Sequence, residues 1–225
     1  MVRCHLSPYT RLPADTIVEI APGFGRWTEF LKDYCKHLII VDLSERCIET
    51  CKKRFSRYSH LDYHVNDGKS LDFIADESID FVFSFDSLVH AEAEVFQAYL
   101  AQLAIKLKPN ATGFIHHSNL ASYLDPVTKE LPAGFENKHW RATSMSAKVF
   151  EEYSEQVHLQ CISQEEVNWG GEALNDVFSV FTRKGSTWSR DRRLQNPQFM
   201  NEANYIARLA SLYSVRLSKV AYDGS

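Results

Sequence analysis

The most constraining feature of this 225-residue chain is a short apolar run that ends in a glycine turn and leads into a helical pattern. Residues 17–20, Ile-Val-Glu-Ile, read as a buried strand, and residues 21–25, Ala-Pro-Gly-Phe-Gly, interrupt it. Apolar side chains then recur at helical spacing, so residues 26–36 are predicted as a helix. Glycine lets the backbone approach a ligand closely, and a helix start offers free N–H groups to a polar ligand.

An acidic residue follows at the end of the next apolar run. Residues 38–41 are Leu-Ile-Ile-Val, and Asp42 comes directly after them, 17 residues beyond Gly25. A carboxylate at the tip of a second strand can accept hydrogen bonds from both hydroxyls of a ribose. The glycine turn and this acid together predict a site for an adenosine-containing cofactor.

Two classes of cofactor use this layout. A dinucleotide is usually bound by G-x-G-x-x-G, and Thr28 stands at the third glycine position, so that match is poor. The segment from Glu19 to Gly25 instead resembles motif I of the class I S-adenosylmethionine-dependent methyltransferases, acidic-x-x-x-Gly-x-Gly, and the resemblance continues to near residue 120. It implies S-adenosylmethionine as the cofactor. An adenine-dinucleotide-dependent oxidoreductase and a catalytically silent cofactor-binding partner protein are the alternatives.

The chain alternates strands and helices, which predicts a doubly wound, mostly parallel sheet. Strands are predicted at 17–20, 38–41, 61–65, 78–85, 112–117, 158–167 and 176–183, and helices at 26–36, 44–57, 91–107, 144–157 and 198–214. The short link between the last two strands predicts an antiparallel pair. The resemblance implies a Rossmann-like fold with seven strands. Residues 1–184 are predicted as the methyltransferase domain and 185–225 as its C-terminal helical extension.

Composition narrows the range of partners. The net charge is −4 and the pI about 6.1, so no global basic field is available to hold nucleic acid. There is no apolar run long enough to span a membrane, and the N-terminus lacks the apolar core of a signal peptide. The five cysteines form no C-x-x-C. A cytoplasmic enzyme acting on a small molecule is expected, and the sequence does not indicate its oligomeric state.

The resemblance assigns cofactor contacts to the ends of the first four strands. The two glycines are expected beside the methionine part, Asp42 at the ribose, and Asp67 at the adenine amino group. Glu19 lies inside a strand, where a carboxylate needs a partner such as a cationic ligand or Arg26. The predicted cofactor-binding residues are Glu19, Ala21, Gly23, Gly25, Trp27, Asp42, Leu43, Asn66, Asp67, Gly68 and Phe85.

Methyl transfer is an in-line displacement, so the protein mainly aligns the nucleophile, the carbon and the sulfur. A hydroxyl acceptor also has to lose a proton, which calls for a base or a metal. His90 is the predicted base, His117 the second choice, and Asp86 completes the predicted catalytic set. These three side chains are an alternative divalent-metal site, which is not favoured because magnesium prefers oxygen ligands. The predicted acceptor is a hydroxyl of a small molecule, such as a sugar or a carbohydrate-bearing metabolite.

The irregular, aromatic-rich segment 120–143 lies where the resembling enzymes place a substrate lid, and loops of this length are often functional. Arg141 is expected to meet an anionic or hydroxylated substrate. Successive residues of a strand face opposite sides, so only one of His116 and His117 is expected to face the cleft. The predicted substrate-binding residues are His116, Asn119, Tyr123, Trp140 and Arg141.

Overall fold

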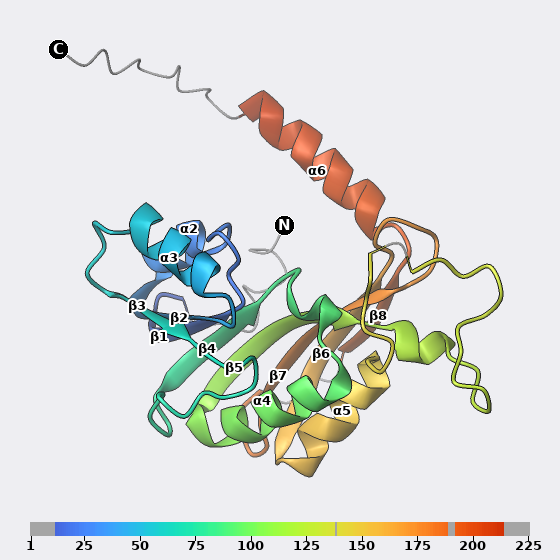
Figure 1. Ribbon diagram of the computed structural model, residues 1–225, viewed down its shortest axis with the longest axis horizontal. Coiled ribbons are helices and arrows are strands. Elements are labelled where there is room, and N and C mark those ends of the chain that lie inside the picture. Colours follow the sequence, from blue (N-terminus) through green and yellow to red (C-terminus); the bar gives the residue numbers. More distant parts are fainter. Residues whose placement is uncertain (1–11, 138, 189–191, 214–225) are drawn as a thin grey trace.

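Eight strands form one sheet in the part of the chain that the structure describes, in the order β3-β2-β1-β4-β5-β7-β6-β8 (Figure 1). This computed structural model describes residues 12–137, 139–188 and 192–213. The strands are β1 (Ala14–Ile20), β2 (Cys35–Asp42), β3 (Leu61–Val65), β4 (Ile79–Ser84), β5 (Leu107–Ser118), β6 (Leu159–Val167), β7 (Asp176–Arg183) and β8 (Arg192–Asn196). The helices are α2 (Thr28–Leu31), α3 (Glu45–Arg54), α4 (Ala93–Lys106), α5 (Ala147–Gln156) and α6 (Phe199–Tyr213), with 3₁₀ turns η1 (Lys32–Tyr34), η2 (Leu88–His90) and η3 (Leu120–Tyr123).

The pairing of the strands confirms the predicted fold class. Strands β1 to β5 are parallel, whereas β7 runs antiparallel to both β5 and β6. The predicted bounds of β3 and β7 agree with the structure to the residue. Strands β2 and β4 carry near-continuous apolar runs because helices cover both faces of the sheet.

Each face of the sheet has its own core. Helices α2 and α3 lie over one face, and α4 and α5 over the other (Figure 1). In β1, Ile17 packs with Ile48 and Phe55 of the α3 side, while Val18 packs with Leu100 of α4. The alternation of side chains along each strand therefore divides the apolar residues between the two layers.

The first predicted helix is shorter than the sequence suggested. Only Thr28–Leu31 is α-helical, and a 3₁₀ turn continues to Tyr34. The prediction of a helix to residue 36 was wrong, because Cys35 already pairs with Ala14 as the start of β2. The backbone groups of residues 35–37 are used by the sheet ladder, which overrides the local helical spacing.

The C-terminal part adds a strand that the sequence did not predict. Strand β8 pairs in parallel with β6, and its first four side chains are exposed, so no apolar alternation marked it. Helix α6 follows and points away from the sheet (Figure 1). The predicted extension 185–225 thus joins the sheet through β8, while residues 1–11, 138, 189–191 and 214–225 lie outside the described residues. Within the described ranges, no helix has the length and apolar content that a membrane span requires.

Candidate active site

A cavity of about 310 Å³ opens at the carboxyl ends of β1 to β4, and we call it the strand-end cavity. This is where open α/β sheets bind their ligands. Predicted cofactor residues that line it are Ala21, Asp42, Leu43, Asp67 and Gly68. The predicted base, His90, also lines it, as do residues that were not predicted: Ile20, Val41, Lys69, Ser87, Leu88, Ala91, Val95 and Tyr99. The cavity thus gathers residues from the ends of four strands and from α4.

Asp42 closes the end of β2 and holds the glycine turn. Its two carboxylate oxygens accept hydrogen bonds from Gly23 N–H at 3.3 Å and Ser44 N–H at 2.8 Å. Burial raises the pKa of Asp42 against the lowering effect of these backbone donors. Each carboxylate oxygen can accept more than one hydrogen bond, so the side chain can still receive two hydroxyl groups.

The two glycines of the turn do different work. Gly23 has φ +57°, and a Cβ built on it would meet nothing within 4 Å, so its surface is open to a ligand. Gly25 has φ +81°, and a Cβ there would lie 2.5 Å from the Phe55 ring. We therefore assign Gly25 to close packing against α3, which its sequence position could not reveal.

Glu19 is buried inside β1 and is paired locally. The Thr28 hydroxyl donates a 2.5 Å hydrogen bond to its Oε2. Burial raises the pKa of Glu19 to about 7, and the Thr28 hydrogen bonds offset only part of that effect. Arg26, which the sequence suggested as a partner, instead forms an ion pair with Asp86 at 3.0 Å. Thr28 occupies the third glycine position of a dinucleotide motif, so its side chain is committed to Glu19.

The raised pKa of Glu19 predicts a pH-dependent stability. The folded state keeps a proton that the unfolded chain releases near pH 4.5, so stability should fall as the pH rises from 4.5 to about 7. Glu19→Gln removes this dependence, and we expect it to raise the free energy of unfolding at alkaline pH by about 3 kcal/mol. Urea denaturation as a function of pH measures this. An equal pH dependence in wild type and variant would show that Glu19 does not titrate in this range.

The turn after β3 carries two polar side chains, Asn66 and Asp67, that both form hydrogen bonds with the Ser70 backbone. The Asp67 carboxylate accepts hydrogen bonds from the N–H groups of Lys69 and Ser70, and these bonds lower its pKa. The Asn66 amide donates to Ser70 O at 2.9 Å and to the Tyr99 hydroxyl at 3.0 Å. Tyr99 comes from α4, and its helical spacing alone did not separate it from core residues.

Trp27 and Phe85 form an aromatic wall and do not line the strand-end cavity. Their ring centroids are 5.0 Å apart in an edge-on arrangement. The indole N–H of Trp27 is buried and has no hydrogen-bond partner among the described residues. Phe85 also contacts the rings of His116 and Trp169. The wall therefore links the end of β4 to the β6–β7 connection.

His90 lies in η2 and lines the strand-end cavity. Its Nδ1 is 3.0 Å from the carbonyl oxygen of Trp140, and a carbonyl can only accept, so Nδ1 carries the proton. Nε2 of the neutral ring is then the atom that can accept a proton. Asp86, four residues earlier, has a left-handed backbone with φ +58°, which is uncommon for a residue other than glycine.

The two adjacent histidines of β5 face opposite sides of the sheet, as expected. His117 is stacked on Phe150 of α5 at 4.8 Å, its ring nitrogens contact Ser118 O and Ser179 Oγ, and burial lowers its pKa to about 3. This ring lies in the core beneath α5, which does not suit a base at the strand-end cavity. His116 lies on the side of the Phe85–Trp169 wall but is also fully buried.

Arg141 lines a cavity, as a substrate contact would, but its charge is paired with that of a buried carboxylate. Its Nε and Nη2 donate to the two carboxylate oxygens of Asp176 at 2.6 and 2.8 Å. Burial alone would raise the pKa of Asp176, but the hydrogen bonds from Arg141 and His116 outweigh it and hold the pKa below its usual value. The guanidinium charge is thus neutralised inside the protein.

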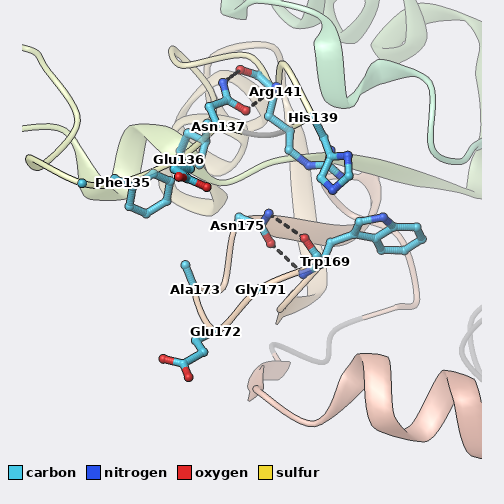
Figure 2. Close-up of a pocket in the computed structure, with 13 residues that line it drawn as sticks. Phe135, Glu136, Asn137, His139, Arg141, Trp169, Gly171, Glu172, Ala173 and Asn175 are labelled. Atoms are coloured by element: carbon cyan, nitrogen blue, oxygen red, sulfur yellow. Dashed lines mark hydrogen bonds between the residues drawn. The ribbon is translucent and has the colours of Figure 1, made fainter.

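A second cavity, of about 380 Å³, lies between the segment 120–143 and the β6–β7 connection, and we call it the lid cavity. Figure 2 shows side chains of the segment on one side and of the connection on the other. Its lining is aromatic, amide and acidic: Leu120, Gly134, Phe135, Glu136, Asn137, His139, Arg141, Trp169, Gly170, Gly171, Glu172, Ala173 and Asn175. The sequence analysis missed Trp169 and Glu172, which lie far along the chain from the segment 120–143.

Three predicted substrate residues are placed differently. Asn119 is buried, and its amide donates to Leu174 O, so it fastens the end of β5 to the β6–β7 connection. The Tyr123 hydroxyl accepts from Leu174 N–H at 2.9 Å. Neither residue lines the lid cavity. Trp140 is 83% exposed, and its backbone carbonyl is hydrogen-bonded to His90 Nδ1.

Asp86, His90 and His117 do not assemble into a metal site. Across residues 12–137, 139–188 and 192–213, no group of three or more His, Cys, Asp or Glu side chains could hold a metal ion. The divalent-metal alternative is therefore not proposed.

Comparison with known proteins identifies the class. Residues 17–110 match a family described as a methyltransferase domain. This match and the fold together confirm the predicted resemblance to the class I S-adenosylmethionine-dependent methyltransferases. Residues of this chain also match ribosomal RNA small subunit methyltransferase A from Coxiella burnetii, at 30% identity over 59 residues. That match covers 26% of this chain, and the chain spans only 23% of the relative's length.

Solved structures share the fold over most of the chain. A putative S-adenosylmethionine-dependent methyltransferase from Listeria monocytogenes has a TM-score of 0.62 at 14% identity, covering 81% of this chain and 97% of its own. The N-methyltransferase NodS from Bradyrhizobium japonicum has a TM-score of 0.57 at 18% identity, covering 81% and 91%. A TehB-like methyltransferase from Corynebacterium glutamicum has a TM-score of 0.54 at 19% identity, covering 76% and 80%.

Proposed function

We propose that this protein transfers a methyl group from S-adenosylmethionine to a small-molecule acceptor. One observation supports this most strongly: the strand-end cavity brings a ribose-binding carboxylate, Asp42, together with His90, whose Nε2 can accept a proton. S-adenosylmethionine supplies the activated methyl group when bound. The net charge of −4 gives no basic field for an RNA substrate, so a small molecule is favoured.

The donor groups fit an adenosine cofactor without a diphosphate. Asp42 would hold the ribose hydroxyls, and Leu43 and Val95 would offer apolar surface to the adenine ring. The open side of Gly23 would admit the methionine part. Helix α2 has only four residues, and Thr28 is bound to Glu19. This leaves no glycine-rich helix start for a pyrophosphate, which disfavours the dinucleotide oxidoreductase.

The proposed acceptor is a hydroxyl group bound in the lid cavity. The backbone of residues 139–141 joins the two cavities, because Trp140 O holds His90 while His139 and Arg141 line the lid cavity. Trp169 offers an aromatic surface on which a sugar ring can pack. His90 Nε2 would take the proton that the hydroxyl loses. Nδ1 would keep its own proton, which it donates in the hydrogen bond to the Trp140 carbonyl.

An amino group is the second candidate acceptor. Glu136 and Glu172 both line the lid cavity, and Arg141 is neutralised by Asp176, so the cavity favours a cationic or polar group over an anion. The similar fold of an N-methyltransferase agrees with this alternative. Label transfer from methyl-tritiated S-adenosylmethionine to a panel of glycosides, catechols and amines would distinguish the two acceptors.

We expect His90→Gln to lower turnover on the acceptor that the panel identifies by about 10²-fold, the usual scale for a lost general base. Affinity for S-adenosylhomocysteine should stay within about twofold, because glutamine leaves the Asp42 end of the cavity intact. Initial rates and isothermal titration calorimetry measure the two quantities. Unchanged turnover would reduce His90 to a residue that only lines the cavity.

Calorimetry with S-adenosylhomocysteine and with NAD tests the cofactor itself. The proposal requires binding of the first and not of the second. Binding of S-adenosylhomocysteine with no label transfer to any acceptor in the panel would favour the catalytically silent binding protein instead.

A further inference from the structure

A buried hydrogen-bond network joins three residues that are distant in the sequence. Asp176, at the start of β7, accepts from His116 Nε2 at 2.9 Å and, through both oxygens, from Arg141. The side chains of His116 and Asp176 are fully buried, and that of Arg141 is 4% exposed. Such a network costs desolvation free energy, and an apolar trio could fill the same space. Packing alone therefore does not account for this network.

One arm of the network reaches the turn that precedes His90. His116 Nδ1 accepts the backbone N–H of Asp86 at 3.2 Å, so the ring is the neutral form protonated on Nε2. Asp86 has a left-handed backbone, which needs restraint from its surroundings. The next residue, Ser87, donates its hydroxyl to Ala21 O at 2.7 Å and so ties this turn to the glycine turn.

The other arm reaches the carbonyl that orients His90. Arg141 follows Trp140 directly, and Asn137 accepts Arg141 N–H while donating to Arg141 O, both at 2.8 Å. The side chain of Arg141 anchors this short loop to Asp176, which sets the position of the Trp140 carbonyl. Asp176 thus holds, through two different partners, both the chain entering η2 and the acceptor of the His90 Nδ1 proton.

We propose that the network of His116, Asp176 and Arg141 positions His90, fixing its tautomer so that Nε2 faces the strand-end cavity unprotonated. This inference rests on the proposed function for the role of His90, but the tautomer can be measured without any acceptor substrate. His116 and Arg141 are positioning residues in this account, because neither acts on substrate directly.

A pair of substitutions at His116 separates its two hydrogen bonds. Glutamine places an amide nitrogen near the position of Nε2, so His116→Gln keeps a donor to Asp176 but loses the acceptor for Asp86 N–H. Asparagine places an oxygen near Nδ1, so His116→Asn keeps that acceptor. Thr182→Val is the matched control. Thr182 lies on β7, the strand that begins at Asp176, but near the opposite end, and the variant removes its buried 2.6 Å hydrogen bond to Ala111 O of β5.

Two-bond ¹H–¹⁵N correlation spectra of ¹⁵N-labelled protein, recorded at alkaline pH, report the tautomer of each neutral histidine. The His90 signals are assigned by their loss in His90→Gln. We expect the Nδ1–H form in the wild type and in Thr182→Val, and a mixture of tautomers in His116→Gln, with His116→Asn closer to wild type. Thermal denaturation, run in parallel, should show that Thr182→Val loses stability without this change.

Unchanged His90 signals in His116→Gln would overturn the proposal, as would an equal change in Thr182→Val, since general loosening would then explain both. A failure of the proposed function has a different signature. It would appear as absent binding of S-adenosylhomocysteine, or as turnover that His90→Gln leaves intact, while the tautomer result would stand.

Discussion

Asp176→Ala is expected to lower the free energy of unfolding by about 3–5 kcal/mol, because it leaves the buried Arg141 guanidinium without a counter-charge. His116 would also lose the acceptor for its Nε2 proton. The pKa of Asp176 is lowered in the folded state, so its contribution is present at neutral pH and lost as the pH falls through that lowered value. Urea denaturation at neutral pH measures the loss.

A double variant provides the control for this prediction. Arg141→Met combined with Asp176→Leu removes both charges and leaves apolar side chains of similar volume, so we expect a smaller loss than for Asp176→Ala. The interpretation fails if Asp176→Ala costs less than about 1 kcal/mol, the range of an exposed ion pair.

Asp42→Ala is expected to weaken binding of S-adenosylhomocysteine by about 10²-fold or more. A hydrogen bond to a charged group contributes about 1.5–3 kcal/mol, and the carboxylate is proposed to accept two hydroxyls. Loss of the Gly23 N–H acceptor adds to the effect by loosening the glycine turn. Because burial raises the pKa of Asp42, binding by the wild type should also weaken as the pH falls and the carboxylate protonates.

Asp62→Ala is the matched control for Asp42→Ala. Asp62 lies on the adjacent strand β3, pairs with His37, and does not line the strand-end cavity. Calorimetry should give it the wild-type affinity. If Asp42→Ala binds as tightly as Asp62→Ala, the ribose does not contact Asp42, and the proposed orientation of the cofactor is wrong.

The sequence predicted many residues of the strand-end cavity because each of them lies close in sequence to the end of a strand. The glycine turn follows β1 directly, and Asp42 and Asp67 follow β2 and β3. In a parallel sheet the carboxyl ends of neighbouring strands meet at one edge, so residues identified one strand at a time come together in space. Tyr99 escaped prediction because its spacing in α4 is that of a core residue.

The sequence misled where side chains found partners far along the chain. Arg141 was predicted to meet substrate, and it does line the lid cavity, but its ion pair with Asp176, 35 residues away, was not predicted. The helix predicted over residues 26–36 lost its last residues to β2, because the ladder with β1 uses their backbone groups. Strand β8 carries no alternation of apolar and polar residues that would predict it, because its first four side chains are exposed. Backbone pairing with β6 holds it in the sheet.

The sequence by itself determined the order of strands and helices apart from β8, the resemblance to the methyltransferase class, and the glycine turn with its acid, since apolar spacing and turn residues act over a few positions. Only the tertiary structure decided which histidine faces which layer, and that Asp176 meets His116 and Arg141. Those contacts depend on the register of β5 with β7, where Ser118 pairs with Asp176 and His116 with Phe178. Register is fixed by the packing of the whole sheet, which no local pattern contains.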